Sequence, residues 1–283
     1  MLQAADVTFA YGDEPVVRNV SLDVPDDGFV GIIGPNGSGK TTLLRLLAGT
    51  RAPDRGTIML DGVALRTLAR PAIARRMAVV PQETQLAFEY TVLEVVLMGR
   101  YPHLGAFALE GPSDIAISRE ALRATGTHDL EARPFSTLSG GEKQRVIIAA
   151  ALAQISGEGS VSRKGSTVLL LDEPTAALDL KYQLGVASLL RSLHRQHGLT
   201  VVVSTHDLNF AASLCRTLVM LKQGRVIAAG AVDEVLTPAR IGDLYDVDAE
   251  VSRHPRTGHL TVTPLSTRVA SALRRERDHG NPA

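Results

Sequence analysis

The chain has 283 residues, and its 30 basic residues are balanced by 30 acidic ones, so the formal net charge is zero. A general nucleic-acid-binding protein usually carries a basic excess, so the charge argues against that class. Aromatic residues make up only 4% and Trp is absent, which argues against a stacking platform for single-stranded nucleic acid. The single cysteine, Cys215, excludes an internal disulfide framework and is typical of a reducing compartment.

The sequence also predicts a soluble, intracellular protein. Its apolar runs all fall short of the roughly 18 residues that a membrane-spanning helix requires. The N-terminal stretch MLQAADVTFA lacks the basic region that opens a secretory signal. Both observations are compatible with docking on a membrane protein.

The N-terminal third of the chain reads mostly as short strands and turns. Alternating polarity predicts strands at 6–11 and 21–24, and an apolar run predicts another at 29–34. A glycine-rich loop then opens a helix that ends at Gly49. Two further strands are expected, at 56–62 and at 77–82.

Helical patterning dominates from Thr91 to about Gln154, and the polar stretch 156–167 is expected to be a plain surface loop. Apolar runs at 168–171 and 199–204, with a helical segment between them, predict parallel strands covered on both faces. Residues 218–230 resemble a hairpin, and 268–277 are expected to form a short charged helix. The chain is therefore predicted to be an α/β protein with a helical insertion. Cys215 falls in an apolar run and is expected in the core.

The stretch GPNGSGKT fits the pattern of a phosphate-binding loop between a strand and a helix. Its glycines let the backbone curl so that several N–H groups point at one anion. Lys40 adds a compact positive charge for the outer phosphates, and Thr41 offers a hydroxyl to Mg²⁺. The predicted nucleotide-binding residues are Gly34, Pro35, Asn36, Gly37, Ser38, Gly39, Lys40, Thr41 and Thr42.

Two carboxylates follow the apolar strand in VLLLDEP. In open α/β sheets ligands collect outside the carboxyl ends of the strands. Asp172 is therefore expected to hold Mg²⁺, directly or through water, and Glu173 to take a proton from an attacking water. A solvated acidic pair at a strand end is the simpler alternative, which the nearby phosphate loop disfavours.

The stretch LSGGEKQR has the spelling of a helix start, because Ser139 and Glu142 stand three apart before an apolar run. Two glycines, Gly140 and Gly141, lie inside it, where they add nothing to helix stability. Bare backbone N–H groups at a helix start suit the approach of an anion.

Together these motifs resemble the ATP-binding subunit of ABC transporters, over nearly all of residues 1–240. LSGGEKQR is similar to that family's signature stretch, and VVPQET places Gln82 at the Q-loop. AALD ends at Asp179 as the D-loop, and VVVSTHD carries His206 as the switch histidine. Tyr11 stands where the family places an aromatic ring against adenine.

The resemblance implies a P-loop ATPase core with a mixed sheet, an antiparallel N-terminal β subdomain and a helical subdomain at about 86–154. Residues 241–283 are expected to form a C-terminal extension of short strands and a charged tail. The resemblance also implies head-to-tail pairing of two subunits, in which Ser139, Gly140, Gly141 and Glu142 of one subunit face the γ-phosphate held by the other. Catalysis is assigned to Glu173, His206 and Gln82, and Mg²⁺ to Thr41, Gln82 and Asp172.

The family likeness further implies a separate integral-membrane permease, which docks on residues 91–105 on the cytoplasmic face of the plasma membrane. A substrate-binding protein is an indirect partner, and nucleic acid is not expected. VLMGRYPHL, STHDLNFAASLC and the HPRTG stretch resemble the importers of metal chelates: iron–siderophore, haem or cobalamin. The chain does not distinguish among these cargoes.

Other readings of the same residues stay open. A soluble ABC ATPase that acts on ribosomes or DNA usually has two such modules or a long coiled-coil insertion, whereas this chain has one GPNGSGKT loop and neither. A transporter subunit for another substrate is a further alternative. A P-loop kinase or GTPase would leave LSGGEKQR unexplained. His194 and His197 stand three apart on a predicted helix and are read as solvated rather than metal-binding.

Replacing Lys40 with Ala tests where the phosphates bind. We expect the Lys40→Ala chain to bind ATP at least about tenfold more weakly, because a charged hydrogen bond to phosphate is lost while the glycine loop remains. Calorimetric titration with ATP measures the affinity, and Lys164→Ala in the 156–167 stretch is the control. Unchanged affinity in Lys40→Ala would contradict the placement.

Overall fold

A central sheet of mixed direction organises the chain, which a computed structural model describes over residues 1–157, 167–176 and 178–268. Within these residues its strand order is β10-β9-β3-β8-β7-β6. Strands β9 to β6 run parallel, and β10 pairs antiparallel with β9 in the predicted hairpin. The strands are β3 (Phe29–Ile33), β6 (Met77–Val80), β7 (Val168–Asp172), β8 (Thr200–Thr205), β9 (Thr217–Lys222) and β10 (Arg225–Ala231).

Both faces of the central sheet are buried, as the continuous apolar runs predict. Successive residues of a strand point to opposite faces, so each inner strand contributes to two separate cores. In β7, Leu169 and Leu171 face one core while Val168 and Leu170 face the other. Strand β6 ends at Val80, two residues earlier than predicted, because Pro81 has no N–H to donate to a ladder.

A second, antiparallel sheet covers one face of the central sheet. Its strand order is β2-β1-β4-β5, and β1 starts at Leu2 rather than at residue 6. Its apolar side chains share a core with helix α1 (Lys40–Leu47) and the near face of the central sheet. The strands are β1 (Leu2–Tyr11), β2 (Glu14–Val24), β4 (Arg55–Leu60) and β5 (Val63–Ala64).

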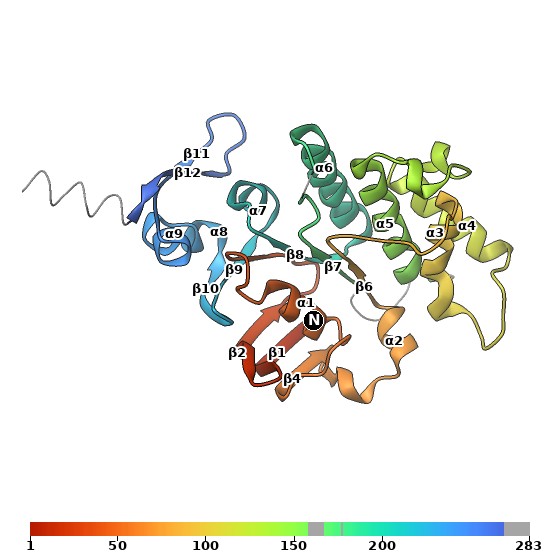
Figure 1. Ribbon diagram of the computed structural model, residues 1–283, viewed down its shortest axis with the longest axis horizontal. Helices are drawn as coiled ribbons and strands as arrows, with labels where there is room; N and C mark the ends of the chain where they lie inside the picture. The colour runs from red at the N-terminus through yellow and green to blue at the C-terminus, as the bar shows by residue number, and fades with distance from the viewer. Residues whose placement is uncertain (158–166, 177, 269–283) are drawn as a thin grey trace, which may run out of the picture.

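Helices cover the other face of the central sheet and extend beyond it at one end (Figure 1). Helices α6 (Leu180–His197) and α7 (Leu208–Leu214) lie above the sheet in this view. Helices α3 (Val92–Leu97), α4 (Pro112–Ala124) and α5 (Gly140–Ile155) group at one end. The remaining short helices are η1 (Leu65–Thr67), α2 (Arg70–Ala74), η2 (Met98–His103), η3 (His128–Leu130) and η4 (Phe135–Thr137).

The C-terminal elements gather at the opposite end of the molecule (Figure 1). They are α8 (Val232–Val235), α9 (Pro238–Tyr245) and an antiparallel pair, β11 (Val247–Arg253) and β12 (Leu260–Thr267). The expected helix at 268–277 and most of the expected loop at 156–167 lie outside the described residues. The mixed central sheet, the antiparallel N-terminal sheet and the inserted helices confirm the predicted fold class.

One histidine differs from its prediction. His194 is buried, its Nδ1 lies 2.9 Å from the carbonyl oxygen of Leu199, and its ring meets the edge of Phe29. The reason is that α6 ends at Gly198 in the left-handed conformation, after which the chain turns back into β8 over the last helical turn. His197 is exposed. Cys215 is buried as predicted, and burial raises the pKa of its thiol.

No helix in the described part of the chain is both long enough and apolar enough to cross a bilayer.

A buried charge holds together the helices that group at one end of the molecule. The guanidinium of Arg100 is almost wholly buried and lies 2.9 Å from the carboxylate of Asp114. The same guanidinium donates to the carbonyls of Ala153 and Ser156 at the C-terminal end of α5.

Asp114 in turn caps the start of α4 by accepting from the Gly111 N–H at 3.0 Å. Burial alone would raise the pKa of Asp114, but the Gly111 N–H and the Arg100 guanidinium outweigh it and lower that pKa. Arg100 therefore joins η2, α4 and the carbonyl end of α5. Among the described contacts, no other buried cation contacts the Asp114 carboxylate or the carbonyl groups of Ala153 and Ser156.

We expect Arg100→Met to lower the free energy of unfolding by about 3–5 kcal/mol, because it leaves a carboxylate and two carbonyls buried without their cation. The matched control is Arg119→Ala, which removes the exposed Arg119–Glu131 pair and should cost at most about 1 kcal/mol. Urea unfolding followed by circular dichroism measures both. Equal losses in the two variants would contradict this account.

Candidate functional site

The predicted phosphate loop connects β3 to α1 and leaves the start of α1 without a side-chain cap. Gly37 and Gly39 have φ values of 77° and 102°, a conformation that glycine adopts at little cost. A Cβ on Gly34 would lie 2.2 Å from the carbonyl oxygen of Leu221, so the loop has no room for a side chain there. The hydroxyl of Ser38 is buried and has no hydrogen-bond partner. The loop thus presents free donors at a helix N-terminus, where an anion is stabilised.

Lys40 lies folded back over this loop. Its ammonium donates to the carbonyl oxygens of Gly34 at 2.9 Å and Pro35 at 3.2 Å. It also lies 3.2 Å from Oε1 of Glu173, and the lysine side chain is only 5% exposed. A buried cation is therefore held beside the loop donors and one carboxylate.

The two predicted carboxylates point to different partners, as expected for adjacent residues after a strand. Asp172 accepts a hydrogen bond from the Ser204 hydroxyl at 2.6 Å, and its register partner across β7 and β8 is Ser204 itself. Glu173 follows in the left-handed region at φ 45°, which is strained for a residue with a Cβ. Its N–H donates to the carbonyl and to the hydroxyl of Ser204, both at 3.1 Å. Ser204 thus orients both acids.

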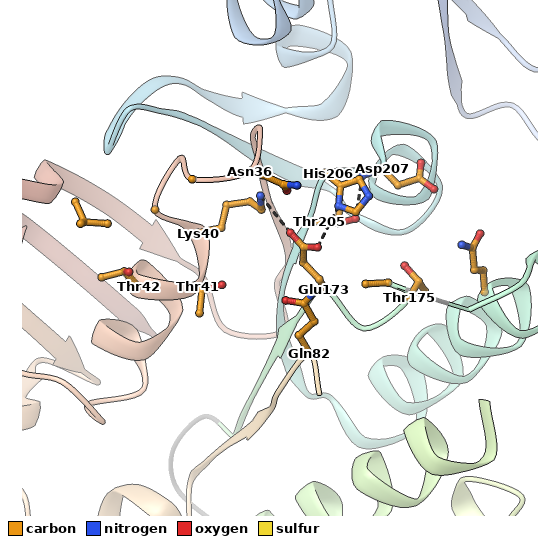
Figure 2. A pocket seen from close by; sticks show the side chains of 15 residues that line it. Asn36, Lys40, Thr41, Thr42, Gln82, Glu173, Thr175, Thr205, His206 and Asp207 are labelled. Atoms are coloured by element: carbon orange, nitrogen blue, oxygen red, sulfur yellow. Dashed lines mark hydrogen bonds and ion pairs between the residues drawn. The ribbon is translucent and has the colours of Figure 1, made fainter. Parts of the chain in front are cut away.

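His206 follows β8 directly and completes this cluster. Its Nδ1 lies 3.1 Å from Oε2 of Glu173, so Glu173 contacts Lys40 with one oxygen and His206 with the other (Figure 2). The imidazole is 54% exposed. Asp207, the next residue, caps α7 by accepting from the N–H groups of Asn209 and Phe210, each at 2.9 Å.

These groups open into one cavity of about 560 Å³, a volume suited to a small-molecule ligand. Gln82, two residues past the end of β6, lines the same cavity as Glu173 (Figure 2). The predicted residues among its lining are Asn36, Gly37, Gly39, Lys40, Thr41, Thr42, Gln82, Glu173 and His206. The lining residues that the sequence reasoning missed are Val16, Thr175, Ala176, Gln183, Thr205 and Asp207.

Tyr11 lies beside this cavity without lining it. Its ring is 44% exposed and meets Phe9 edge to face at 4.9 Å. Hydrogen bonding to Thr42 and Arg45, with the positive charge of Arg45, lowers the pKa of the Tyr11 hydroxyl. An exposed ring tied to the first helix after the loop is available for stacking against a planar ligand.

The LSGGE stretch forms the start of α5 and lies outside the cavity of its own chain. Ser139 caps the helix, with Glu142 accepting from its N–H and its hydroxyl at 2.8 Å, and these bonds lower the pKa of Glu142. Ser139 and Gly140 are both exposed to solvent.

Gly141 has a packing reason that the sequence did not reveal. It is buried, and a Cβ there would lie 2.2 Å from the ring of Tyr182 in α6. Asp179 caps that helix through the Tyr182 N–H at 3.3 Å. The start of α5 is thus packed against the start of α6, and Asp179 does not line the cavity.

Comparison with known proteins agrees with this geometry. Residues 17–176, more than half of the chain, match the family described as ABC transporter. The chain is 42% identical to the hemin import ATP-binding protein HmuV of Gloeobacter violaceus, over 94% of this chain and 95% of that protein. It is 37% identical to the iron(3+)-hydroxamate import ATP-binding protein FhuC of Bacillus subtilis, over 90% and 91%. It is 41% identical to the cobalamin import ATP-binding protein BtuD of Halobacterium salinarum, of which it spans 62%.

Solved structures give the same result. An inward-facing transporter assigned to the metal-chelate ABC type superposes with a TM-score of 0.79 at 28% identity, covering 95% of this chain and 98% of that one. The dimeric structure of a bacterial ABC transporter cassette superposes with a TM-score of 0.68 at 30% identity, covering 82% and 99%. The phosphate loop, the carboxylate and the histidine meet at one cavity, and the sheet order agrees with these matches. This chain therefore belongs to the ABC transporter family.

Proposed function

We propose that this chain is the ATP-hydrolysing subunit of an ABC importer that takes up a metal chelate through a separate membrane permease. The cavity in which Lys40, Glu173 and His206 meet at the uncapped start of α1 carries the proposal. The similar proteins named for the import of hemin, iron(3+)-hydroxamate and cobalamin support the cargo class of iron–siderophore, haem or cobalamin.

In this proposal the phosphates of ATP bind at the loop of residues 34–42. The unpartnered Ser38 hydroxyl and the free N–H groups at the start of α1 are the donors, and Lys40 supplies the charge. Tyr11 stacks against the base, because its exposed ring lies over the first turns of α1.

The site also suits Mg²⁺, since its donor set is a hydroxyl, an amide oxygen and a carboxylate, the hard oxygen ligands that this ion prefers. Thr41 and Gln82 line the cavity, and Asp172 lies at the strand end behind Glu173, oriented by Ser204. Thr41, Gln82 and Asp172 would hold the ion, which would supply charge neutralisation of the phosphates.

The chemistry of the chain's own residues centres on the Lys40–Glu173 pair. The Lys40 ammonium lies 3.2 Å from Oε1 of Glu173. A triphosphate attracts Lys40 more strongly than one carboxylate does, so its arrival frees Glu173 to accept a proton from an attacking water. His206, at 3.1 Å from the other oxygen, keeps the carboxylate oriented toward the cavity.

In this proposal two copies of the chain together complete the site, since the LSGGE stretch does not line the cavity of its own chain. Ser139, Gly140, Gly141 and Glu142 of one copy would face the γ-phosphate held by the other, with Asp179 at the same interface. The exposure of Ser139 and Gly140 supports this arrangement. The dimeric form of a similar cassette supports it as well.

The permease would bind the surface after Gln82, on the cytoplasmic face of the plasma membrane, and a substrate-binding protein would act through that permease. Large apolar side chains are exposed there, at Phe88, Tyr101, Phe107 and Leu109. Exposed apolar patches mark interaction sites in soluble proteins. Because Gln82 lines the cavity at the start of this segment, it is placed to link docking with the nucleotide site.

Glu173→Gln tests the base. We expect ATP binding to be retained and kcat to fall by about 10²–10⁴-fold, because the amide keeps the shape of the side chain and cannot take a proton. Phosphate release measures turnover, and fluorescent nucleotide titration measures binding. Glu110→Gln, an acidic residue outside the cavity, is the control. Near-normal hydrolysis by Glu173→Gln would refute the assigned role.

Ser139→Arg tests the contact between copies. Each chain should still bind ATP, but the ATP-dependent dimer should be lost, because a long cation replaces the cap that faces the partner's phosphate. The matched control is Thr91→Arg, since Thr91 caps α3 with the same kind of capping box through Glu94 and is not part of the LSGGE stretch. Both changes remove a cap worth about 1 kcal/mol. Size-exclusion chromatography with ATP reads the state, and a persisting Ser139→Arg dimer would show that the contact is wrong.

A further inference from the structure

The segment that carries His206 is held in place from the C-terminal end of the chain. The His206 imidazole is 54% exposed, so packing around the ring does not by itself fix its direction. Its approach to Glu173 then depends on the backbone of residues 205–209. That backbone is contacted by α9 and β12, elements that follow it by more than thirty positions in the sequence.

Asn209, in the first turn of α7, makes the firmer of these contacts. Its side-chain Nδ2 donates to the carbonyl oxygen of Val262 at 3.2 Å, and its Oδ1 accepts from the Val262 N–H at 2.8 Å. This two-point bond fixes the helix start against the backbone of β12, which lies beside α7 (Figure 1). The amide is not needed to cap α7, since Asp207 already does so.

Tyr245, the last residue of α9, contacts the same segment from another side. Its hydroxyl donates to the carbonyl oxygen of His206 at 3.4 Å and lies at the backbone of Gly34 in the phosphate loop. Burial, with the negative charges of Glu173 and Asp207, raises the pKa of this hydroxyl, so it is a neutral donor at physiological pH. The Tyr245 side chain therefore contacts both the segment that carries His206 and the phosphate loop.

These contacts also join two stretches that the sequence analysis compared with the metal-chelate importers, STHDLNFAASLC and the strand that follows HPRTG. Asn209 lies in the first stretch, and its partner Val262 lies in the second, on β12.

We propose that α9 and β12 form a positioning device for His206, with Asn209 and Tyr245 as its positioning residues. The inference rests on the proposed ATPase function. Asn209 fixes the start of α7, Tyr245 fixes the His206 carbonyl, and together they hold the imidazole at its 3.1 Å approach to Glu173. Neither residue touches the reacting atoms.

The test compares steady-state ATP hydrolysis by the full chain and its variants. Asn209→Ala should lower kcat by about tenfold to a hundredfold, because a misplaced group loses its productive geometry. The KM for ATP should change less than about twofold, since the phosphate loop is intact. Tyr245→Phe keeps the ring and its packing and should show a smaller loss of kcat in the same direction. Ser266→Ala removes a bond inside the β11–β12 pair, to Asp248, and should leave kcat unchanged.

A double-mutant cycle separates positioning from general loosening. In a His206→Ala background, adding Asn209→Ala should lower the single-turnover rate less than about twofold, because Asn209 acts through a group that is already gone. The inference is overturned if Asn209→Ala alone stays within twofold of the parent. It is also overturned if the loss is equally large in the His206→Ala background. Two other outcomes would contradict the proposed ATPase function itself: a parent chain that hydrolyses no ATP, or a Glu173→Gln chain that keeps full activity.

Discussion

Parallel pairing of β3, β8 and β7 is the constraint on which the rest of the site depends. In register, Ile33 pairs with Thr205, and Asp172 pairs with Ser204. The three strands therefore end together, and the phosphate loop, the carboxylates and the switch histidine leave the sheet at one edge. Buried apolar side chains on both faces hold this register, because a slip of one residue would exchange the two cores.

A glycine without room for a side chain and a residue at strained positive φ both stand at that edge, each for a physical reason. Gly34 must pass close to the backbone of β9, and Glu173 must turn to positive φ so that its carboxylate reaches Lys40 and His206 while Asp172 points to Ser204. A strained residue of this kind costs about 1–3 kcal/mol and persists only where its surroundings hold it. Two hydrogen bonds from the Glu173 N–H to Ser204 provide that support.

The sequence predicted the parts of the site that are local in the chain. The phosphate loop, the paired carboxylates and the capping box each depend on residues within a few positions, so spacing alone indicated them. It missed contacts between distant residues: Ser204 with Asp172, Asn209 with Val262, Tyr245 with His206, and Gly141 under Tyr182. The solvated reading of His194 was wrong because Phe29 of β3 packs against its ring and Leu199, just past the end of α6, contacts its Nδ1.

The most direct measurement is the structure of the Glu173→Gln chain with ATP and Mg²⁺ bound. The account predicts two copies with nucleotide between them, the phosphates at Lys40 of one copy and Ser139 and Gly140 of the other against the γ-phosphate. Nucleotide bound at Lys40 with residues 139–141 of both copies far from every phosphate would contradict it. In that case the cavity would be a complete site within a single chain.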